Sequence, residues 1–152
     1  MNLILEKSKF VDYYTYLDPL FEAVPEFVEP VYLVSNLETG GGTDIRLAGY
    51  SLVISGHALR DIVVKEKVQF IWAVFSAFDH APIIPTELPY ADGNPDFWCG
   101  SPRPQIPGAK FEIVCWDSGS TLFIGVDENI AVKLRTMYPD ILDLDEENRK
   151  RG

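Results

Sequence analysis

The sequence predicts an α+β protein: an antiparallel sheet of about five strands, with two or three helices packed mainly on one side. Three observations lead to this class. Runs of β-branched and aromatic residues indicate strands, apolar residues spaced three and four apart indicate helices, and one tight turn joins two strands into a hairpin. With 152 residues, 47% of them hydrophobic, residues 1–152 fit a single domain with one core.

The first elements are expected in the order helix, strand, strand. Ser8 is a suitable N-cap, and the apolar residues after it share one helical face: Phe10, Tyr13, Tyr14 and Leu17. Pro19 is expected at or near the end of this helix. Residues 31–37 and 45–55 have strand composition, and the glycine-rich loop 38–44 joins them as neighbouring antiparallel strands.

The middle of the chain predicts a short helix followed by a central strand. Residues 57–68 fit either a helix or a strand. We favour the helix because the apolar residues after a potential cap at Ser55 or Gly56 share one face: Leu59, Ile62 and Val63. Residues 69–78 form a continuous apolar run rich in aromatic and β-branched residues, which is typical of a strand buried on both faces.

Residues 79–109 are expected to form one long proline-rich loop. Seven of the eleven prolines lie here, so regular structure cannot run through the whole stretch. The stretch also carries Tyr90, Phe97 and Trp98, large apolar groups that a flexible linker does not need. We therefore predict an ordered loop that packs on the body of the protein.

The C-terminal third predicts a hairpin, a helix and a tail. Residues 111–116 and 121–126 are two strands joined by the turn sequence Asp-Ser-Gly-Ser. Asp127 then caps a helix whose apolar stripe faces the core: Ile130, Leu134 and Met137. Pro139 ends that helix. The last residues, 143–152, are acidic and then basic, and we expect them to fray.

The charge balance is the most unusual feature of the composition. Asp and Glu total 23 against 13 Lys and Arg, giving a net charge of −10. Such a surface repels nucleic-acid phosphates and anionic membranes, so neither is an expected partner. It attracts basic proteins and accelerates their association, although acidity can also serve solubility alone.

No sequence motif meets the requirements for catalysis or cofactor binding. The run Gly-Gly-Gly-Thr at 40–43 lacks the lysine and the following helix of a phosphate-binding loop. The run 92–96 matches the first ligands of a calcium loop, but Phe97 and Arg103 occupy the positions that need Gly and Glu. The turn at 117–120 has no serine in a nucleophile elbow. We therefore predict no catalytic residue, no cofactor and no enzymatic activity.

Metal sites and membrane segments are equally unsupported by the sequence. Cys99 and Cys115 are not a Cys-x-x-Cys pair, and only His57 and His80 could add imidazole ligands. The apolar run at the N-terminus is shorter than that of a signal peptide, and no stretch approaches the length of a membrane span. The expected location is the cytoplasm.

One segment combines aromatic and acidic residues in a way that favours protein binding. Between residues 87 and 98 there are three acids and no base, interleaved with aromatic side chains. Aromatic anchors within an acidic rim suit a basic protein partner. The candidate contact residues are Glu87, Tyr90, Asp92, Asp96, Phe97 and Trp98. The alternative is that Phe97 and Trp98 pin the loop to the core.

Two stretches of the C-terminal half carry a resemblance. Residues 111–125, FEIVCWDSGSTLFIG, and the loop 89–98, PYADGNPDFW, resemble small bacterial immunity proteins of polymorphic-toxin and contact-dependent inhibition systems. These families share no catalytic motif, so no residue role carries over. The resemblance implies a cytoplasmic antidote that binds a cognate toxin, often a nuclease, and blocks its active site or substrate path.

The charge agrees with that expectation, because nuclease toxins are basic where they hold nucleic acid. Two alternatives remain open. One is a small enzyme or ligand-binding domain that uses clustered carboxylates in a pocket beneath the loop 79–109. The other, which fits the dispersed acids less well, is a mimic of nucleic acid.

Overall fold

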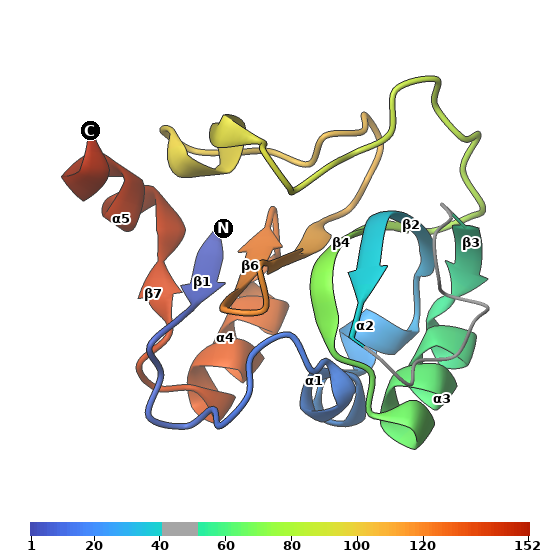
Figure 1. Ribbon diagram of the computed structural model, residues 1–152, viewed down its shortest axis with the longest axis horizontal. Coiled ribbons are helices and arrows are strands. Elements are labelled where there is room, and N and C mark those ends of the chain that lie inside the picture. The colour runs from blue at the N-terminus through green and yellow to red at the C-terminus, as the bar shows by residue number, and fades with distance from the viewer. Residues whose placement is uncertain (41–51) are drawn as a thin grey trace.

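A computed structural model describes residues 1–40 and 52–152. Within these residues, seven strands form one antiparallel sheet in the order β3-β2-β4-β5-β6-β1-β7 (Figure 1). The α+β class is therefore confirmed, with more strands than the five expected. The strands are β1 (Leu3–Leu5), β2 (Val31–Thr39), β3 (Leu52–Ser55), β4 (Phe70–Phe78), β5 (Glu112–Trp116), β6 (Ser120–Ile124) and β7 (Leu142–Asp143).

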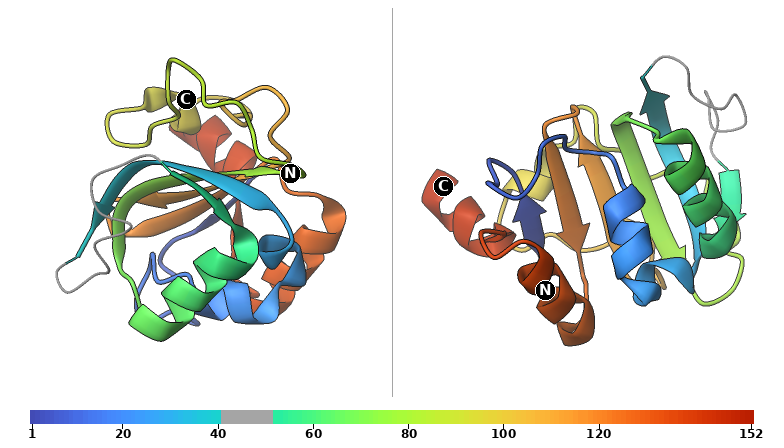
Figure 2. Two further views of the ribbon diagram at one scale, coloured as in Figure 1. Left: turned by 90° about the vertical axis from the view of Figure 1, so that its right-hand side faces the viewer. Right: turned by 90° about the horizontal axis from the view of Figure 1, so that it is seen from below.

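The helices divide unequally between the two faces of the sheet. Four of them cover one face, with α4 beneath the strands at one end and α1 to α3 beneath those at the other (Figure 2). The loop 79–109 and α5 cover the opposite face. The helices are α1 (Asp18–Ala23), α2 (Pro25–Val28), α3 (Gly56–Glu66), α4 (Glu128–Met137) and α5 (Leu144–Arg151).

The alternation of side chains along each strand gives two apolar layers. On the helical side, the aromatic residues Phe27, Tyr32 and Phe75 lie in the larger core, all fully buried. On the loop side, Val74 and Val114 belong to a smaller core. β4 contributes to both layers, as its continuous apolar sequence predicts.

The hairpin β5–β6 and the element α3 follow their local sequence signals. Glu112 pairs with Ile124 and Trp116 with Ser120, so the turn falls where the Asp-Ser-Gly sequence predicts it. The prediction of a helix rather than a strand after Ser55 is confirmed, and the Ser55 hydroxyl accepts a hydrogen bond from the Ala58 N–H at 3.1 Å.

Gly56, the first residue of α3, fits only because it lacks a side chain. A Cβ atom there would lie 2.1 Å from the carbonyl oxygen of Val28, the last residue of α2. The Gly56 N–H also donates to the Pro30 carbonyl at 2.7 Å. The close approach locks α3 against the end of α2 and the start of β2.

The prediction of a helix after Ser8 is wrong. The Ser8 hydroxyl donates to Asp140 Oδ1 at 2.6 Å instead of capping a helix, and Thr15 has a φ of 65°, outside the right-handed helical region. Tyr13, expected on a buried face, is 75% exposed. The chain reaches a helix only at α1, where Pro19 lies in the first turn rather than at the end.

The N-terminal strand β1 was not predicted. Leu3 pairs with Phe123 of β6 and with Asp143 of β7, and all three residues of β1 are buried. A strand of three residues is too short to show a periodic pattern. Its stabilisation comes from partners more than a hundred residues away.

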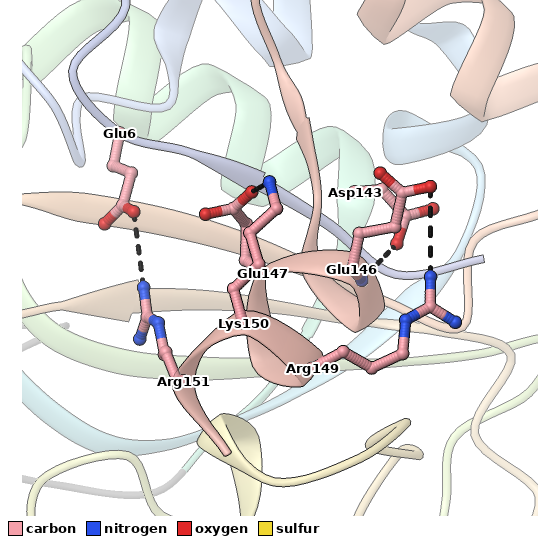
Figure 3. Close-up of polar contacts among 7 residues, drawn as sticks. All are labelled: Glu6, Asp143, Glu146, Glu147, Arg149, Lys150 and Arg151. Atoms are coloured by element: carbon pink, nitrogen blue, oxygen red, sulfur yellow. Dashed lines mark hydrogen bonds and ion pairs between the residues drawn. The ribbon is translucent and has the colours of Figure 1, made fainter.

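The prediction that residues 143–152 fray is also wrong, because this segment forms α5. The Asp143 carboxylate caps the helix by accepting from the Glu146 N–H at 2.9 Å (Figure 3). Acidic side chains occupy the first turn and basic ones the last, which complements the helix dipole. Arg151 extends from the last turn to Glu6, 3.3 Å away, and so ties α5 to the residue that follows β1.

One predicted element lies partly outside the described residues. The strand expected over 45–55 is described only from Leu52, where β3 pairs antiparallel with β2 as expected. The glycine-rich run 40–43 lies beyond the described part except for Gly40.

Candidate functional site

The loop 79–109 is ordered and packs on the sheet, as predicted. Its one regular piece is a short 3₁₀ helix, Pro95–Trp98. Phe97, at 1% exposure, and the fully buried Ala91 join the smaller core against Val74 and Val114 of the sheet. The apolar side chains of the loop thus cover the hydrophobic layer on this face of the sheet.

The strand β2 fixes the middle of the loop through polar side chains. The side-chain oxygen Oδ1 of Asn36 accepts from the Ala91 N–H at 2.7 Å and from the Asp92 N–H at 2.9 Å. Asn36 adopts a φ of 51° where the pairing of β2 with β4 shifts register. Beside it, the buried Ser35 hydroxyl donates to the Pro89 carbonyl at 2.7 Å.

A second set of hydrogen bonds lies within the loop. The Gln105 side chain accepts from the Tyr90 N–H at 3.1 Å and donates to the Tyr90 carbonyl at 3.2 Å. The Asn94 amide also donates to the Tyr90 carbonyl, at 3.0 Å. The backbone around Tyr90 is therefore held from both sides before any partner arrives.

Helix α5 holds the next part of the loop. The buried Asn148 amide donates to the carbonyls of Phe97 and Gly100 at 3.0 and 3.1 Å. The guanidinium of Arg151 lies 4.5 Å from the centre of the Trp98 ring, which also meets Trp116 edge-on at 4.8 Å. The C-terminal helix is therefore a structural support for the loop.

A buried carboxyl group lies between the loop and the sheet. Glu112 of β5 is fully buried, and its Oε1 accepts from the Gln105 N–H at 2.6 Å and from the Ser76 hydroxyl at 3.4 Å. Its Oε2 has no partner among the described residues. Burial raises the pKa of Glu112 to about 7, and the hydrogen bonds from Gln105 and Ser76 offset only part of that effect.

The outer side of the loop displays apolar and acidic residues together. We call residues 83–96 the apolar–acidic segment. Four of its large apolar side chains are exposed, with Ile83 at 94%, Ile84 at 53%, Tyr90 at 45% and Leu88 at 38%. Its acids, Glu87, Asp92 and Asp96, are also exposed, and no Lys or Arg occurs from residue 81 to residue 102. Exposed apolar groups beside unopposed acids are characteristic of an interaction surface.

The structure separates the predicted contact residues into two groups. Glu87, Tyr90, Asp92 and Asp96 are exposed and available to a partner. Phe97 is not, because it is buried in the core beneath the loop, and its assignment as a contact residue is wrong. Trp98 is half-buried between Trp116 and Arg151, so the alternative that it pins the loop describes its position better.

Three exposed apolar residues of this segment were missed: Ile83, Ile84 and Leu88. A signal was present in the sequence, because each lies beside a proline, at Pro82, Pro85 or Pro89. Apolar residues that prolines keep out of helices and central strands have no regular element in which to be buried. Some of them must therefore face solvent.

The remaining chemistry-bearing groups are dispersed. Among residues 1–40 and 52–152, no three His, Cys, Asp or Glu side chains group as metal ligands would. Cys99 is exposed in the loop, whereas burial of Cys115 raises the pKa of its thiol. Three cavities stand out in the described part, and none is lined by residues 79–109. No helix there is long and apolar enough to cross a bilayer.

This chain matches no protein-family model and has no significant match among the curated proteins or the solved structures.

Proposed function

We propose that this protein is a cytoplasmic, acidic binding module that neutralises a basic protein, as a bacterial immunity protein neutralises its toxin. The observation that carries the proposal is the apolar–acidic segment, which displays Ile83, Ile84, Leu88 and Tyr90 beside three exposed acids. The partner we infer is a basic toxin domain, of the nuclease type that the charge complements.

The two kinds of side chain have different roles in this proposal. The carboxylates steer a basic partner and set its orientation, while the apolar side chains supply affinity when water leaves the contact. The hydrogen bonds that the loop backbone makes with the side chains of Asn36, Asn94 and Gln105 keep it in place in advance. Less conformational entropy is then lost on binding, so more of the contact energy appears as affinity.

The alternative of a carboxylate-based enzyme draws no support from the buried acid beneath the loop. The hydrogen-bond partners of Glu112 are Gln105 and Ser76, and no second carboxyl contacts it among the described residues. Paired acids, which such chemistry requires, are not brought together there.

Co-expression with the C-terminal domain of a polymorphic toxin encoded directly upstream of this chain tests the proposal. The expected result is rescue of growth together with co-purification of the two proteins. Absence of such a neighbouring toxin, or failure of both rescue and co-purification, would contradict it.

Two variants then locate the contact. Ile83→Asp and the pair Asp92→Lys with Asp96→Lys should each weaken binding about tenfold or more, because they place charge in the apolar contact or reverse the local field. Val132→Asp, at an aliphatic residue 52% exposed on α4, is the control for the first. Asp61→Lys with Glu66→Lys on α3 makes the same net charge change on the other face of the sheet. Equal losses in variant and control would assign the effect to bulk charge or folding.

A further inference from the structure

A recess lies on the helical side of the sheet, away from the loop 79–109. It has a volume of about 720 Å³ and is formed by the stretch from Phe10 to Leu20, the C-terminal end of α4, and single residues of β1 and β6. In Figure 1 this stretch runs along the lower edge of the molecule between β1 and α1. The volume is within the range of cavities that hold small molecules.

Aromatic rings are prominent in the wall of this cavity. Five aromatic residues line it: Phe10, Tyr13, Tyr14, Tyr16 and Tyr138. The rings of Tyr13 and Tyr16 meet at 63° with their centres 6.0 Å apart, so they form a corner rather than a stack. The recess is open to solvent on one side, and aromatic rings at its rim offer faces over which a cation can bind.

The charges at the cavity favour a positive ligand. Its lining holds two carboxylates, Asp12 and Asp18, and a single lysine. That lysine, Lys67, is bound to Asp18 with 2.7 Å between Nζ and Oδ2, so its charge is already compensated. The exposed carboxylate of Asp12 makes no ion pair with a described residue, and it leaves the cavity with one unbalanced negative charge.

We propose that this cavity binds a small organic cation: an ammonium or guanidinium group on an aromatic or apolar body. The cation lies against the tyrosine rings and Asp12, and the apolar body packs on the floor provided by Leu20 and Met137. An anion is repelled by the Asp12 carboxylate and by the negative faces of the rings. A neutral ligand of the same size gains the apolar contact but not the electrostatic one.

Titration with three matched probes separates these cases. The probes are 2-phenylethylamine, which is a cation at neutral pH, 2-phenylethanol, which is neutral, and phenylacetate, which is an anion. Calorimetry or ligand-observed NMR on the full chain should show the amine binding about tenfold more tightly than the alcohol, with phenylacetate the weakest. Equal binding of the amine and the alcohol, tighter binding of phenylacetate, or no binding of the amine up to about 10 mM would overturn the proposal.

Substitutions at exposed positions test the same site without disturbing the fold. Tyr13→Leu and Asp12→Asn should each weaken binding of the amine about fivefold, whereas Tyr13→Phe should retain it because the ring remains. Glu66→Gln, an equal charge change at a residue that does not line this cavity, should have no effect. Amine affinity unchanged in Tyr13→Leu and Asp12→Asn would place the binding elsewhere and overturn the assignment. Since toxin neutralisation uses the opposite face, these variants should still rescue growth.

Discussion

Replacing Phe97 with alanine should lower the free energy of unfolding by about 3 to 5 kcal/mol, because it empties a ring-sized volume in a closed apolar layer. Phe97 is 1% exposed and meets Trp116 edge-on at 6.2 Å. Its backbone carbonyl also accepts a hydrogen bond from the side-chain amide of Asn148. Loss of the ring should therefore loosen the loop as well as weaken the core.

Denaturant unfolding measures the first effect and amide hydrogen exchange the second. Exchange should accelerate at Ala91 and Asp92, whose N–H groups donate to Asn36. Tyr90→Ala is the control, since this 45% exposed side chain lies in the same loop and its removal should change stability by less than about 1 kcal/mol. Similar losses in the two variants would mean that Phe97 is not the anchor of the loop.

Glu112→Gln should remove a pH dependence of the free energy of unfolding that the wild type has. The pKa of Glu112 is raised from 4.5 to about 7, so the folded protein holds this proton more tightly than the unfolded chain. The resulting stability is present below pH 4.5 and is lost as the pH rises through about 7. Glutamine stays neutral throughout. As the pH rises from about 4.5 to about 8, the free energy of unfolding of the variant should therefore rise by about 3 kcal/mol relative to that of the wild type.

Unfolding midpoints across that pH range measure the shift. Glu87→Gln makes the same chemical change at an exposed carboxyl of the loop and should follow the wild-type profile. A constant difference between Glu112→Gln and the wild type at every pH would show that the buried carboxyl does not titrate as its burial requires.

Most of the sheet and two helices could be predicted because their signals are local. The β5–β6 hairpin is marked by its turn, β4 by a continuous apolar run, and α3 and α4 by capping residues, Ser55 and Asp127. In each of these elements the residues that decide the structure lie within a few positions of one another.

The errors fall where distant contacts decide the structure. The helical spacing after Ser8 was real, but the bond from Ser8 to Asp140 and the turn conformation of Thr15 prevail over it. α5 has little apolar surface to bury: its buried residues are Leu144 and the polar Asn148. Its order depends on contacts to Phe97, Gly100 and Glu6 that no local pattern could reveal.

The candidate site could be predicted in its acidic residues, but among its exposed apolar residues only Tyr90 was predicted. The acids of the apolar–acidic segment are exposed, and the sequence already showed that no Lys or Arg occurs among residues 81–102. Aromatic residues were harder to place, since Phe97 and Tyr90 lie in the same loop but one is buried and the other exposed. Which of them packs inward depends on the sheet beneath, where Val114 and Trp116 receive Phe97.

The rate of association with the proposed partner, a basic toxin domain, tests the central claim most directly when it is measured by stopped flow at low and high salt. We predict a fall of about tenfold or more as salt rises from about 20 to 200 mM, because screening removes the attraction between the acidic segment and its partner. Asp92→Lys with Asp96→Lys should lose most of this dependence, and Asp61→Lys with Glu66→Lys should keep it. An association rate that does not respond to salt, or that responds equally in both charge variants, would contradict the account.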